Sequence, residues 1–328
     1  ANSGDVNAIV TPPAPSSIVV TGASIVYQSS GTVSAKITPF DSASAACTNC
    51  LQFKVGSTYA TATAFATVSV SDVGTPSAPD YQGSASITAG GTSFGSAGDY
   101  QVWAEYLGNA NVGPGGSAAS ATVTVTPRPT TATITSGDTT PDLGVSSNYV
   151  VTVVPSGVAG TVKLFATIGG VTTEVDSEPA DTDGTSTLEW TPPNAGSYTL
   201  TASFAPTSAN YLSDESDDYP VTVAPFSVSV SVDDLANTGT TDVEVLLSAR
   251  VSLAAAPGTI KFFVTIGGVT SEVGADTSLT AGVGTLPWTP TVAGTYQISA
   301  TYESSSGDYA NDATSSNNQT IVISAPPP

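Results

Sequence analysis

The sequence predicts an all-β protein of three tandem β-sandwich domains arranged as an elongated rod. A stretch of the form Ala-Gly-Xaa-Tyr, followed by alternating apolar and polar residues, occurs three times. Its tyrosines, Tyr100, Tyr198 and Tyr296, lie 98 positions apart (198 − 100 and 296 − 198). Alternation with a period of two is typical of a strand buried on one face. A repeat of about 100 residues built around such a strand indicates an array of sandwiches.

The repeat divides the chain into an N-terminal arm and three domains. The arm covers residues 1–15, and the domains cover residues 16–127, 128–225 and 226–328. Proline restricts the backbone on both of its sides. Because Pro127-Arg128-Pro129 and Ala224-Pro225 leave hardly any linker between domains, we expect stiff joints.

The arm and the first domain depart from the repeat. The arm carries one apolar patch, Ala8-Ile9-Val10, and we expect this patch or the segment from Ile18 to Tyr27 to complete a sheet of a neighbouring subunit. The first domain contains a long inserted segment that holds Cys47 and Cys50, the two cysteines of the chain. The arm and the insertion are therefore candidate contact regions.

The second and third domains are close relatives of each other. Residues 160–170 and 258–268 align without a gap, and each stretch ends in a Gly-Gly pair that predicts a hairpin turn. Trp190 and Trp288 stand in step with the inward-facing residues of their strands, so we expect them in the core.

These stretches resemble the bacterial Ig-like repeat domains of exported cell-surface proteins. The resemblance lies in Gly-Thr-Val-Lys-Leu-Phe at 160–165, in Ala-Gly-Xaa-Tyr before the late strand, and in the loops at 209–211 and 307–309. It covers the second and third domains well, and the first mainly through its Ala-Gly-Xaa-Tyr strand. It implies an Ig-like Greek-key sandwich that serves outside the cell as a spacer, adhesive or structural module, and it names no ligand. The repeated tyrosine also looks like the tyrosine corner of immunoglobulin sandwiches.

Composition excludes several functions. The chain has 27 acidic and six basic residues, a formal charge of −21 and no histidine. Nucleic acid and anionic membranes should repel such a chain, and without histidine the commonest general base is missing, so we expect no enzyme. No apolar run approaches the 18 or so residues that a membrane span needs, so we expect no membrane insertion. The start at Ala1 suggests a mature, secreted product.

The pair Cys47 and Cys50 forms a Cys-Xaa-Xaa-Cys motif. A zinc site needs further cysteine or histidine ligands, which the sequence lacks. A redox pair of the thioredoxin type needs a βαβ context, which an all-β chain does not supply. We therefore predict a local structural disulfide, formed in an oxidising extracellular setting.

Three aromatic residues are candidate interface positions. The alternation turns Trp103 outward, where the other copies have Thr201 and Ser299. Trp103 either stacks on a sugar, anchors a subunit contact, or is covered by the insertion of its own domain. Phe165 and Phe263 also face outward at matching places, unless a bulge turns them inward.

Two further surface features are candidate sites. The acidic run that contains Asp214, Asp217 and Asp218 suits calcium, and a solvated acidic loop is the alternative. Otherwise we expect no cofactor. Asn318 begins an Asn-Xaa-Thr sequon for N-glycosylation.

Together these features predict a secreted structural subunit of a cell-surface assembly, such as a filament, a pilus-like fibre or a surface layer. Its main partner is expected to be a second copy of itself. The alternative is an adhesin or carbohydrate-binding stalk that presents the first domain to cell-surface glycans.

Overall fold

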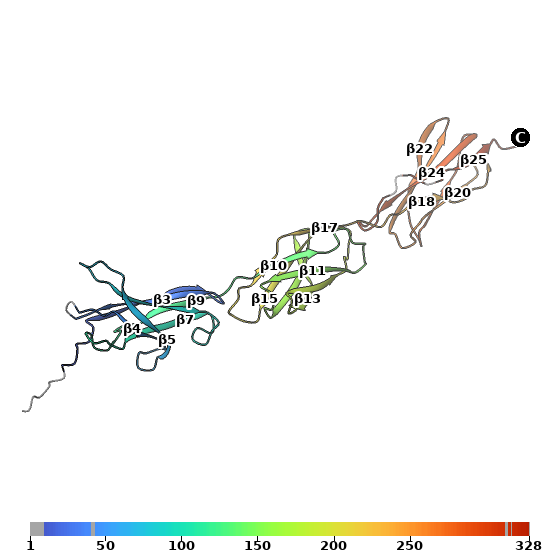
Figure 1. Ribbon diagram of the computed structural model, residues 1–328. Coiled ribbons are helices and arrows are strands. Elements are labelled where there is room, and N and C mark those ends of the chain that lie inside the picture. The colour runs from blue at the N-terminus through green and yellow to red at the C-terminus, as the bar shows by residue number, and fades with distance from the viewer. Residues whose placement is uncertain (1–9, 41–42, 312–313, 316, 328) are drawn as a thin grey trace, which may run out of the picture.

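A computed structural model describes residues 10–40, 43–311, 314–315 and 317–327 of the chain. Its regular elements in this part are strands, β1 to β25, and Figure 1 shows them gathered into three bodies that follow one another end to end. In the described part, no helix is long and apolar enough to cross a membrane. The prediction of an all-β fold is confirmed.

Each body has its own hydrophobic core. The first core extends from Ile18 to Val125, the second from Ala132 to Val223, and the third from Val228 to Ile323. The alternation predicted around the repeated tyrosines holds, since Val102, Leu200 and Ile298 are all fully buried. Their burial on one sheet face supplies the stability of each sandwich.

The first domain forms one nine-stranded sheet that folds over on itself. The strand order is β1-β3-β6-β5-β4-β7-β9-β2, with β8 paired to β7. The inserted segment supplies β5, which pairs with β4 on one side and with β6 on the other, so it joins the two faces of the sandwich. The strands are β1 (Ser17–Thr21), β2 (Ala23–Val26), β3 (Ser30–Thr38), β4 (Cys47–Val55), β5 (Thr63–Asp72), β6 (Tyr81–Thr88), β7 (Gly98–Tyr106), β8 (Gly115–Gly116) and β9 (Ala121–Thr126).

The first strand of this domain changes partner at Gly22. β1 pairs antiparallel with β3, and β2 pairs parallel with β9. A Cβ atom at Gly22 would lie 1.8 Å from the carbonyl oxygen of Thr122, so only glycine fits at the crossing. The segment from Ile18 to Tyr27, one of our two candidate assembly strands, is thus already paired within its own domain, and that expectation was wrong for β1 and β2.

The second and third domains each contain two separate sheets. In the second domain these are β10-β11-β14 and β13-β12-β15, with β16 and β17 both on β15. In the third they are β18-β20-β23 and β19-β25-β24-β21-β22. The strands are β10 (Thr131–Ser136), β11 (Ser147–Val154), β12 (Gly160–Ile168), β13 (Val171–Pro179), β14 (Thr185–Trp190), β15 (Gly196–Pro206), β16 (Asp214–Glu215), β17 (Tyr219–Val223), β18 (Val230–Val232), β19 (Thr238–Thr240), β20 (Val245–Val251), β21 (Gly258–Ile266), β22 (Val269–Ser278), β23 (Val283–Trp288), β24 (Gly294–Ser304) and β25 (Gln319–Ser324).

Both Gly-Gly pairs form the predicted hairpin turns. Gly169 and Gly170 have φ angles of 58° and 80°, and Gly267 and Gly268 have 57° and 80°. Two successive residues with positive φ make the turn that matches the twist of a two-residue hairpin. These turns connect β12 to β13 and β21 to β22.

Candidate functional site

The repeated tyrosines form three identical corners. The hydroxyl of each donates a hydrogen bond to the carbonyl oxygen four residues upstream, from Tyr100 to Ser96 (2.8 Å), from Tyr198 to Asn194 (3.0 Å) and from Tyr296 to Val292 (2.9 Å). An aromatic ring lies edge-on to each tyrosine, supplied by Phe94, Trp190 and Trp288 in turn. The predicted tyrosine corner is therefore present in every domain.

The residues between each carbonyl and its tyrosine form what we call the corner turn: residues 96–100, 194–198 and 292–296. The glycine of each turn adopts a φ angle that other residues rarely adopt, 143° at Gly98, 147° at Gly196 and 158° at Gly294. The need for this φ angle explains why a glycine recurs at this place in every repeat. The turn places the backbone N–H of the preceding alanine at the end of the sandwich.

The first two corner turns bind the next domain. The N–H of Ala97 donates to Oδ1 of Asn210 in the second domain, at 2.7 Å. The N–H of Ala195 donates to Oδ1 of Asp308 in the third domain, also at 2.7 Å. In both pairs the partners are 113 residues apart, so the same contact recurs one repeat further along the chain. We call these contacts the first joint and the second joint.

The accepting side chain is held in a loop of fixed design, the acceptor loop. In the first joint, Ser208 Oγ accepts the N–H of Asn210 at 3.3 Å, and Leu212 N–H donates to the carbonyl oxygen of Arg128 in the linker at 3.0 Å. The linker in turn donates from Arg128 N–H to the carbonyl oxygen of Asn210 at 2.8 Å. The linker is thus paired to the acceptor loop.

The acceptor loop of the third domain repeats this design. Ser306 Oγ accepts the N–H of Asp308 at 3.2 Å, and Ala310 N–H donates to the carbonyl oxygen of Phe226 at 2.9 Å. Phe226 N–H donates to the carbonyl oxygen of Asp308 at 2.8 Å. A linker held on both its N–H and its C=O has little freedom to bend.

Aromatic contacts accompany both joints. Across the first joint, the rings of Tyr27 and Tyr211 meet edge-on with centroids 5.5 Å apart, and Arg128 Nη1 donates to Oε1 of Gln28 at 2.8 Å. At the second joint, the ring of Phe226 in the linker lies 5.6 Å from that of Tyr309. Edge-on aromatic pairs add about 0.5–1.5 kcal/mol beyond their burial.

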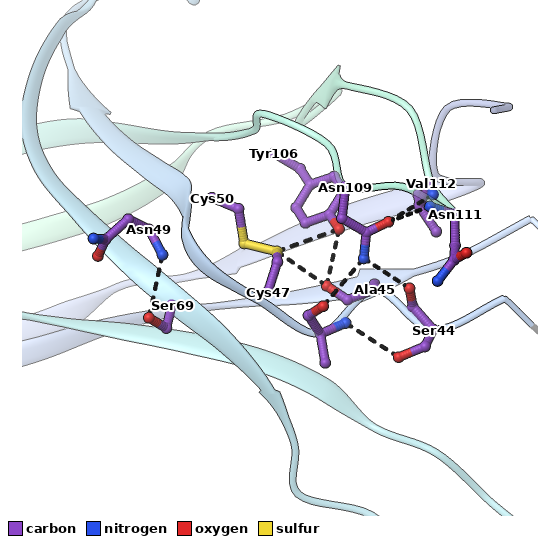
Figure 2. The surroundings of a disulfide bond; sticks show 11 residues. Ser44, Ala45, Cys47, Asn49, Cys50, Ser69, Tyr106, Asn109, Asn111 and Val112 are labelled. Carbon is purple, nitrogen blue, oxygen red and sulfur yellow. Dashed lines mark hydrogen bonds between the residues drawn. A yellow bond between two sulfur atoms is a disulfide. The ribbon is translucent and has the colours of Figure 1, made fainter. Parts of the chain in front are cut away.

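The predicted disulfide is present, and it follows the segment that holds a third acceptor loop. Cys47 and Cys50 are bonded to each other. Figure 2 shows them beside Tyr106, whose hydroxyl donates to the carbonyl oxygen of Ala45 at 2.9 Å. From the same region, Asn109 Nδ2 donates to the carbonyl oxygens of Ser44 (2.9 Å) and Ala46 (3.1 Å). Residues 44–46, which lie just before the disulfide, therefore fix the Asn109 side chain.

Asn109 has the same role in its loop as Ser208 and Ser306 have in theirs: a side-chain oxygen accepts the N–H of the residue two positions later. Its Oδ1 accepts the N–H of Asn111 at 2.8 Å and that of Val112 at 2.7 Å. Gly113 N–H donates to the carbonyl oxygen of Pro13 in the arm at 2.7 Å, so the arm takes the place that a linker has elsewhere. By these bonds Asn111 corresponds to Asn210 and Asp308.

Trp103 is partly covered by the insertion of its own domain. Its Nε1 donates to the carbonyl oxygen of Gly56 at 2.9 Å, and its ring lies edge-on to Tyr59 at 6.1 Å. Lys54 lies over the Tyr59 ring at 5.0 Å and pairs with Glu105. The hydrogen bond to Glu105 raises the pKa of Lys54. Trp103 is thus a partly exposed member of a cluster with Tyr59, Lys54 and Glu105.

Phe165 and Phe263 lie on the outer faces of β12 and β21 and are partly exposed. Their inward neighbours are buried, as the alternation predicts: Val162, Leu164 and Ala166 on β12, and Ile260, Phe262 and Val264 on β21. A bulge in the pairing of β12 with β13 does occur between Leu164 and Phe165, yet it does not turn Phe165 inward.

The acidic run lies partly in a strand. Asp214 begins β16, and its Oδ2 accepts the N–H of Ala132 on β10 at 2.8 Å, while Asp217 and Asp218 are exposed. Among the residues that the structure describes, no three histidine, cysteine or acidic side chains come close enough together to hold a metal ion. Asp214 thus satisfies a backbone N–H on the outer edge of β10, which is the end strand of its sheet.

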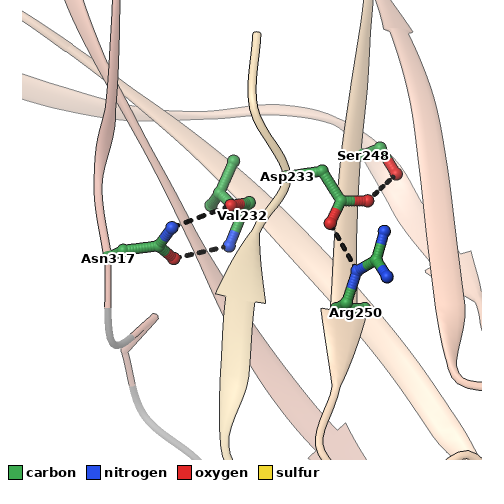
Figure 3. A network of polar contacts seen from close by, with 5 residues as sticks. All are labelled: Val232, Asp233, Ser248, Arg250 and Asn317. Carbon is green, nitrogen blue, oxygen red and sulfur yellow. Dashed lines mark hydrogen bonds and ion pairs between the residues drawn. The ribbon is translucent and has the colours of Figure 1, made fainter.

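The third domain closes the matching edge in another way. Figure 3 shows Asn317 paired with Val232 on β18: Val232 N–H donates to Oδ1 at 2.9 Å, and Nδ2 donates to the carbonyl oxygen at 3.0 Å. Next to it, Asp233 accepts from Arg250 Nε at 2.5 Å and from Ser248 Oγ at 2.6 Å. The bond from Arg250 lowers the pKa of Asp233.

The arm and the glycosylation sequon complete the candidate positions. Ala8 and Ile9 lie outside the described residues, and Val10 is 84% exposed. Asn318 is exposed, and its Oδ1 accepts from Ser315 Oγ at 3.1 Å.

A groove of about 680 Å³ opens on the second domain between β13 and β14. Asp176, Glu178 and Glu189 line it together with Trp190 and Tyr198. Trp190 is only 3% exposed and turns its ring against Tyr198, which is 4% exposed, so these two rings offer no open face for a sugar.

Comparisons with known proteins show no family. No protein-family model matches the chain, and no curated protein matches it. Among solved structures it is similar to a tetra-tandem repeat in the extending region of a large adhesion protein, at 17% identity and a TM-score of 0.41, over 92% of this chain and 74% of that one. It is also similar to chicken CNTN1 FN1–FN3 domains, at 11% identity and a TM-score of 0.24, over 95% and 99%. Because both TM-scores are below 0.5, the functional interpretation rests on the contacts within this chain.

Proposed function

We propose that this protein is a secreted structural subunit of an extracellular cell-surface assembly, such as a filament, a pilus-like fibre or a surface layer. The observation that carries the proposal is the repetition of one joint. Two different pairs of domains meet through an equivalent alanine N–H, an equivalently placed Oδ1 (of asparagine in one joint and of aspartate in the other) and the same linker pairing. Because the joints are equivalent, successive domains are related by the same geometry, as expected for a structural rod built of repeats.

An extracellular location is supported by the disulfide. A bond between Cys47 and Cys50 persists in oxidising compartments and is rare in the cytosol of most organisms. The resemblance to bacterial Ig-like domains of exported proteins points in the same direction. The formal charge of −21 favours a chain that stays dissolved in water.

Immunogold electron microscopy of intact cells of the source organism tests the proposal. Antibodies against the protein should label extended structures outside the cell, and the same structures should disappear when the gene is deleted. Labelling confined to the cell interior, or wild-type surface structures in the deletion strain, would overturn the structural role.

Strand addition by the arm is one assembly route. A groove of about 400 Å³ between β1 and residues 115–120 lies beside the arm. Because Pro13 is bonded to Gly113, a fair test removes only residues 1–10. If the shortened protein assembles as the whole one does, the arm is not the connecting strand, and head-to-tail contact remains as the route.

An adhesin or carbohydrate-binding stalk is the second candidate. It is favoured by the partly exposed cluster of Lys54, Tyr59 and Trp103. Within this cluster, Trp103 occupies the position that Thr201 and Ser299 have in the other domains. A glycan array with the wild-type protein and the Trp103→Ala variant separates the two roles. Saturable binding that the variant loses supports the stalk, and no binding supports the structural subunit.

A further inference from the structure

The first and third domains each carry one half of the joint, and neither half meets its counterpart among the residues that the structure describes. At one end, the corner turn of the third domain is complete, because Tyr296 binds the carbonyl oxygen of Val292. The N–H of Ala293 in that turn has no hydrogen-bond partner among the described residues. At the other end, Asn111 occupies the place of Asn210 and Asp308 in its acceptor loop.

Exposure confirms that both halves are uncovered. The alanines of the two internal joints, Ala97 and Ala195, are half-buried, whereas Ala293 is exposed. The side chains that accept from them, Asn210 and Asp308, are half-buried as well, whereas Asn111 is exposed. Val292, beside Ala293, is 57% exposed, an apolar surface at the open end.

We propose that these halves bind each other between molecules: the corner turn of the third domain in one copy docks on the Asn111 loop of the next copy. Ala293 N–H then donates to Oδ1 of Asn111, as Ala97 donates to Asn210 within the chain. The inference rests on the proposed structural role, and it gives that role a specific head-to-tail contact whose partner is a second copy of this chain.

The contact between copies lacks one bond that the internal joints have. In those joints the linker donates from Arg128 or Phe226 to the acceptor loop. Pro13 holds the equivalent place in the arm, and proline has no N–H to donate. The contact between copies is therefore weaker than an internal joint and forms at high local concentration, as on a crowded surface.

Site-directed cross-linking of the full chain tests the contact. Chains with Ala293→Cys are mixed with chains with Asn111→Cys and treated with a short bismaleimide, whose thioether bonds do not exchange with the Cys47–Cys50 disulfide. We expect a heterodimer on a reducing gel. A chain carrying both Ala97→Cys and Asn210→Cys reports the reaction within an existing joint, and Ala293→Cys mixed with Ser86→Cys, on the exposed face of β6, reports chance encounters.

The inference is overturned if Ala293→Cys and Asn111→Cys give no more heterodimer than Ala293→Cys and Ser86→Cys, while the cysteines at 97 and 210 of the internal joint react fully. Sedimentation velocity gives an independent measurement. Loss of one neutral hydrogen bond should weaken self-association of the Asn111→Ala variant about fivefold, and Asn111→Asp should restore it, since Asp308 serves in the second joint. Equal association of all three proteins contradicts the proposed contact.

Failure here and failure of the structural role give different results. If surface labelling shows assemblies but the Ala293 and Asn111 pair does not react, the head-to-tail contact is wrong and the structural role stands. If the pair reacts but no labelled structures exist outside the cell, the contact is real and the structural role is wrong.

Discussion

Removal of the Asn210 side chain should loosen the first joint and leave the domains folded. In Asn210→Ala the N–H of Ala97 loses its partner oxygen at 2.7 Å. Within the described residues, two direct hydrogen bonds and one aromatic pair cross this joint, those of Ala97 with Asn210, of Arg128 with Gln28, and of Tyr27 with Tyr211. Each contributes about 0.5–1.5 kcal/mol.

The expected effect follows from these magnitudes. Because Ala97 is half-buried, water can reach part of the freed N–H, so we expect a loss near the middle of the range, about 1 kcal/mol. That loss lowers the ratio of docked to undocked domains about fivefold. The aromatic pair and the Arg128 bond remain, so the joint opens more often without falling apart.

Distance measurements between two spin labels report the ratio of docked to undocked domains. Labels at Ser86→Cys on β6 and Ser177→Cys on β13 report the first joint from exposed positions on either side of it. We expect one narrow distance distribution in the wild type and a broader one, with a second population, in Asn210→Ala.

Two variants serve as matched controls. Asn210→Asp keeps an acceptor of the kind found in the second joint and should keep the narrow distribution. Asn111→Ala changes the equivalent residue in a loop that contacts no corner turn among the described residues, and it should leave the distribution unchanged. A distribution in Asn210→Ala as narrow as that of the wild type would refute the role of this hydrogen bond in setting the angle between domains.

Four further predictions concern the stability of single domains, each measured by chemical unfolding of the full chain. Tyr198→Phe removes the corner bond to Asn194 and should cost about 1 kcal/mol, so an unchanged unfolding midpoint contradicts it. Leu200→Ala empties a fully buried position and should cost about 2–5 kcal/mol, whereas a loss under 1 kcal/mol means that the core collapses around the gap. Burial raises the pKa of Tyr149 to about 12. Its neutral form is therefore favoured in the folded state, and the second domain should lose stability as the pH rises from about 10 towards 12. Tyr149→Phe should make the free energy of unfolding less dependent on pH in this range. The same pH dependence in both proteins would contradict this prediction. Replacing Cys47 and Cys50 by serine should cost about 2 kcal/mol or less, because the closed loop is short; a larger loss shows that the disulfide does more than restrict the unfolded chain.

The sequence was sufficient to predict the core and the corners. A period of two around Tyr100, Tyr198 and Tyr296 is a direct consequence of one buried face, so burial of Leu200 and its counterparts could be predicted without any coordinates. The disulfide was predictable for a different reason, since the chain has no other cysteine and no histidine to complete a metal site.

The joints were beyond the sequence, although a trace of them was visible there. Asn210 and Asp308 stand 98 positions apart, each just before a tyrosine, but they differ in residue type and each partner lies 113 residues away. Only the fold brings the acceptor loop of one domain to the corner turn of the one before it. Cover of Trp103 by the insertion was one of three interpretations that the sequence left open, but Tyr59 could not be named as the covering residue, because it lies in an insertion that follows no periodic pattern.

The first domain was predicted least well, because its insertion breaks the repeat. β5 bridges the two faces of the sandwich, so the sheet there is continuous and not divided as in the other domains. The first domain is nevertheless where assembly is expected to act, since Asn109, itself held by Ser44, fixes the loop that presents Asn111.

Electron microscopy of material released from the native cell surface tests head-to-tail assembly most directly. If the corner turn of one copy docks on the Asn111 loop of the next, the protein forms single files or sheets of such files. Their axial repeat is then the length of one three-domain subunit, roughly 100 Å or more from the strand lengths. Assemblies in which the rods meet only side by side, or isolated rods at every concentration, would contradict it.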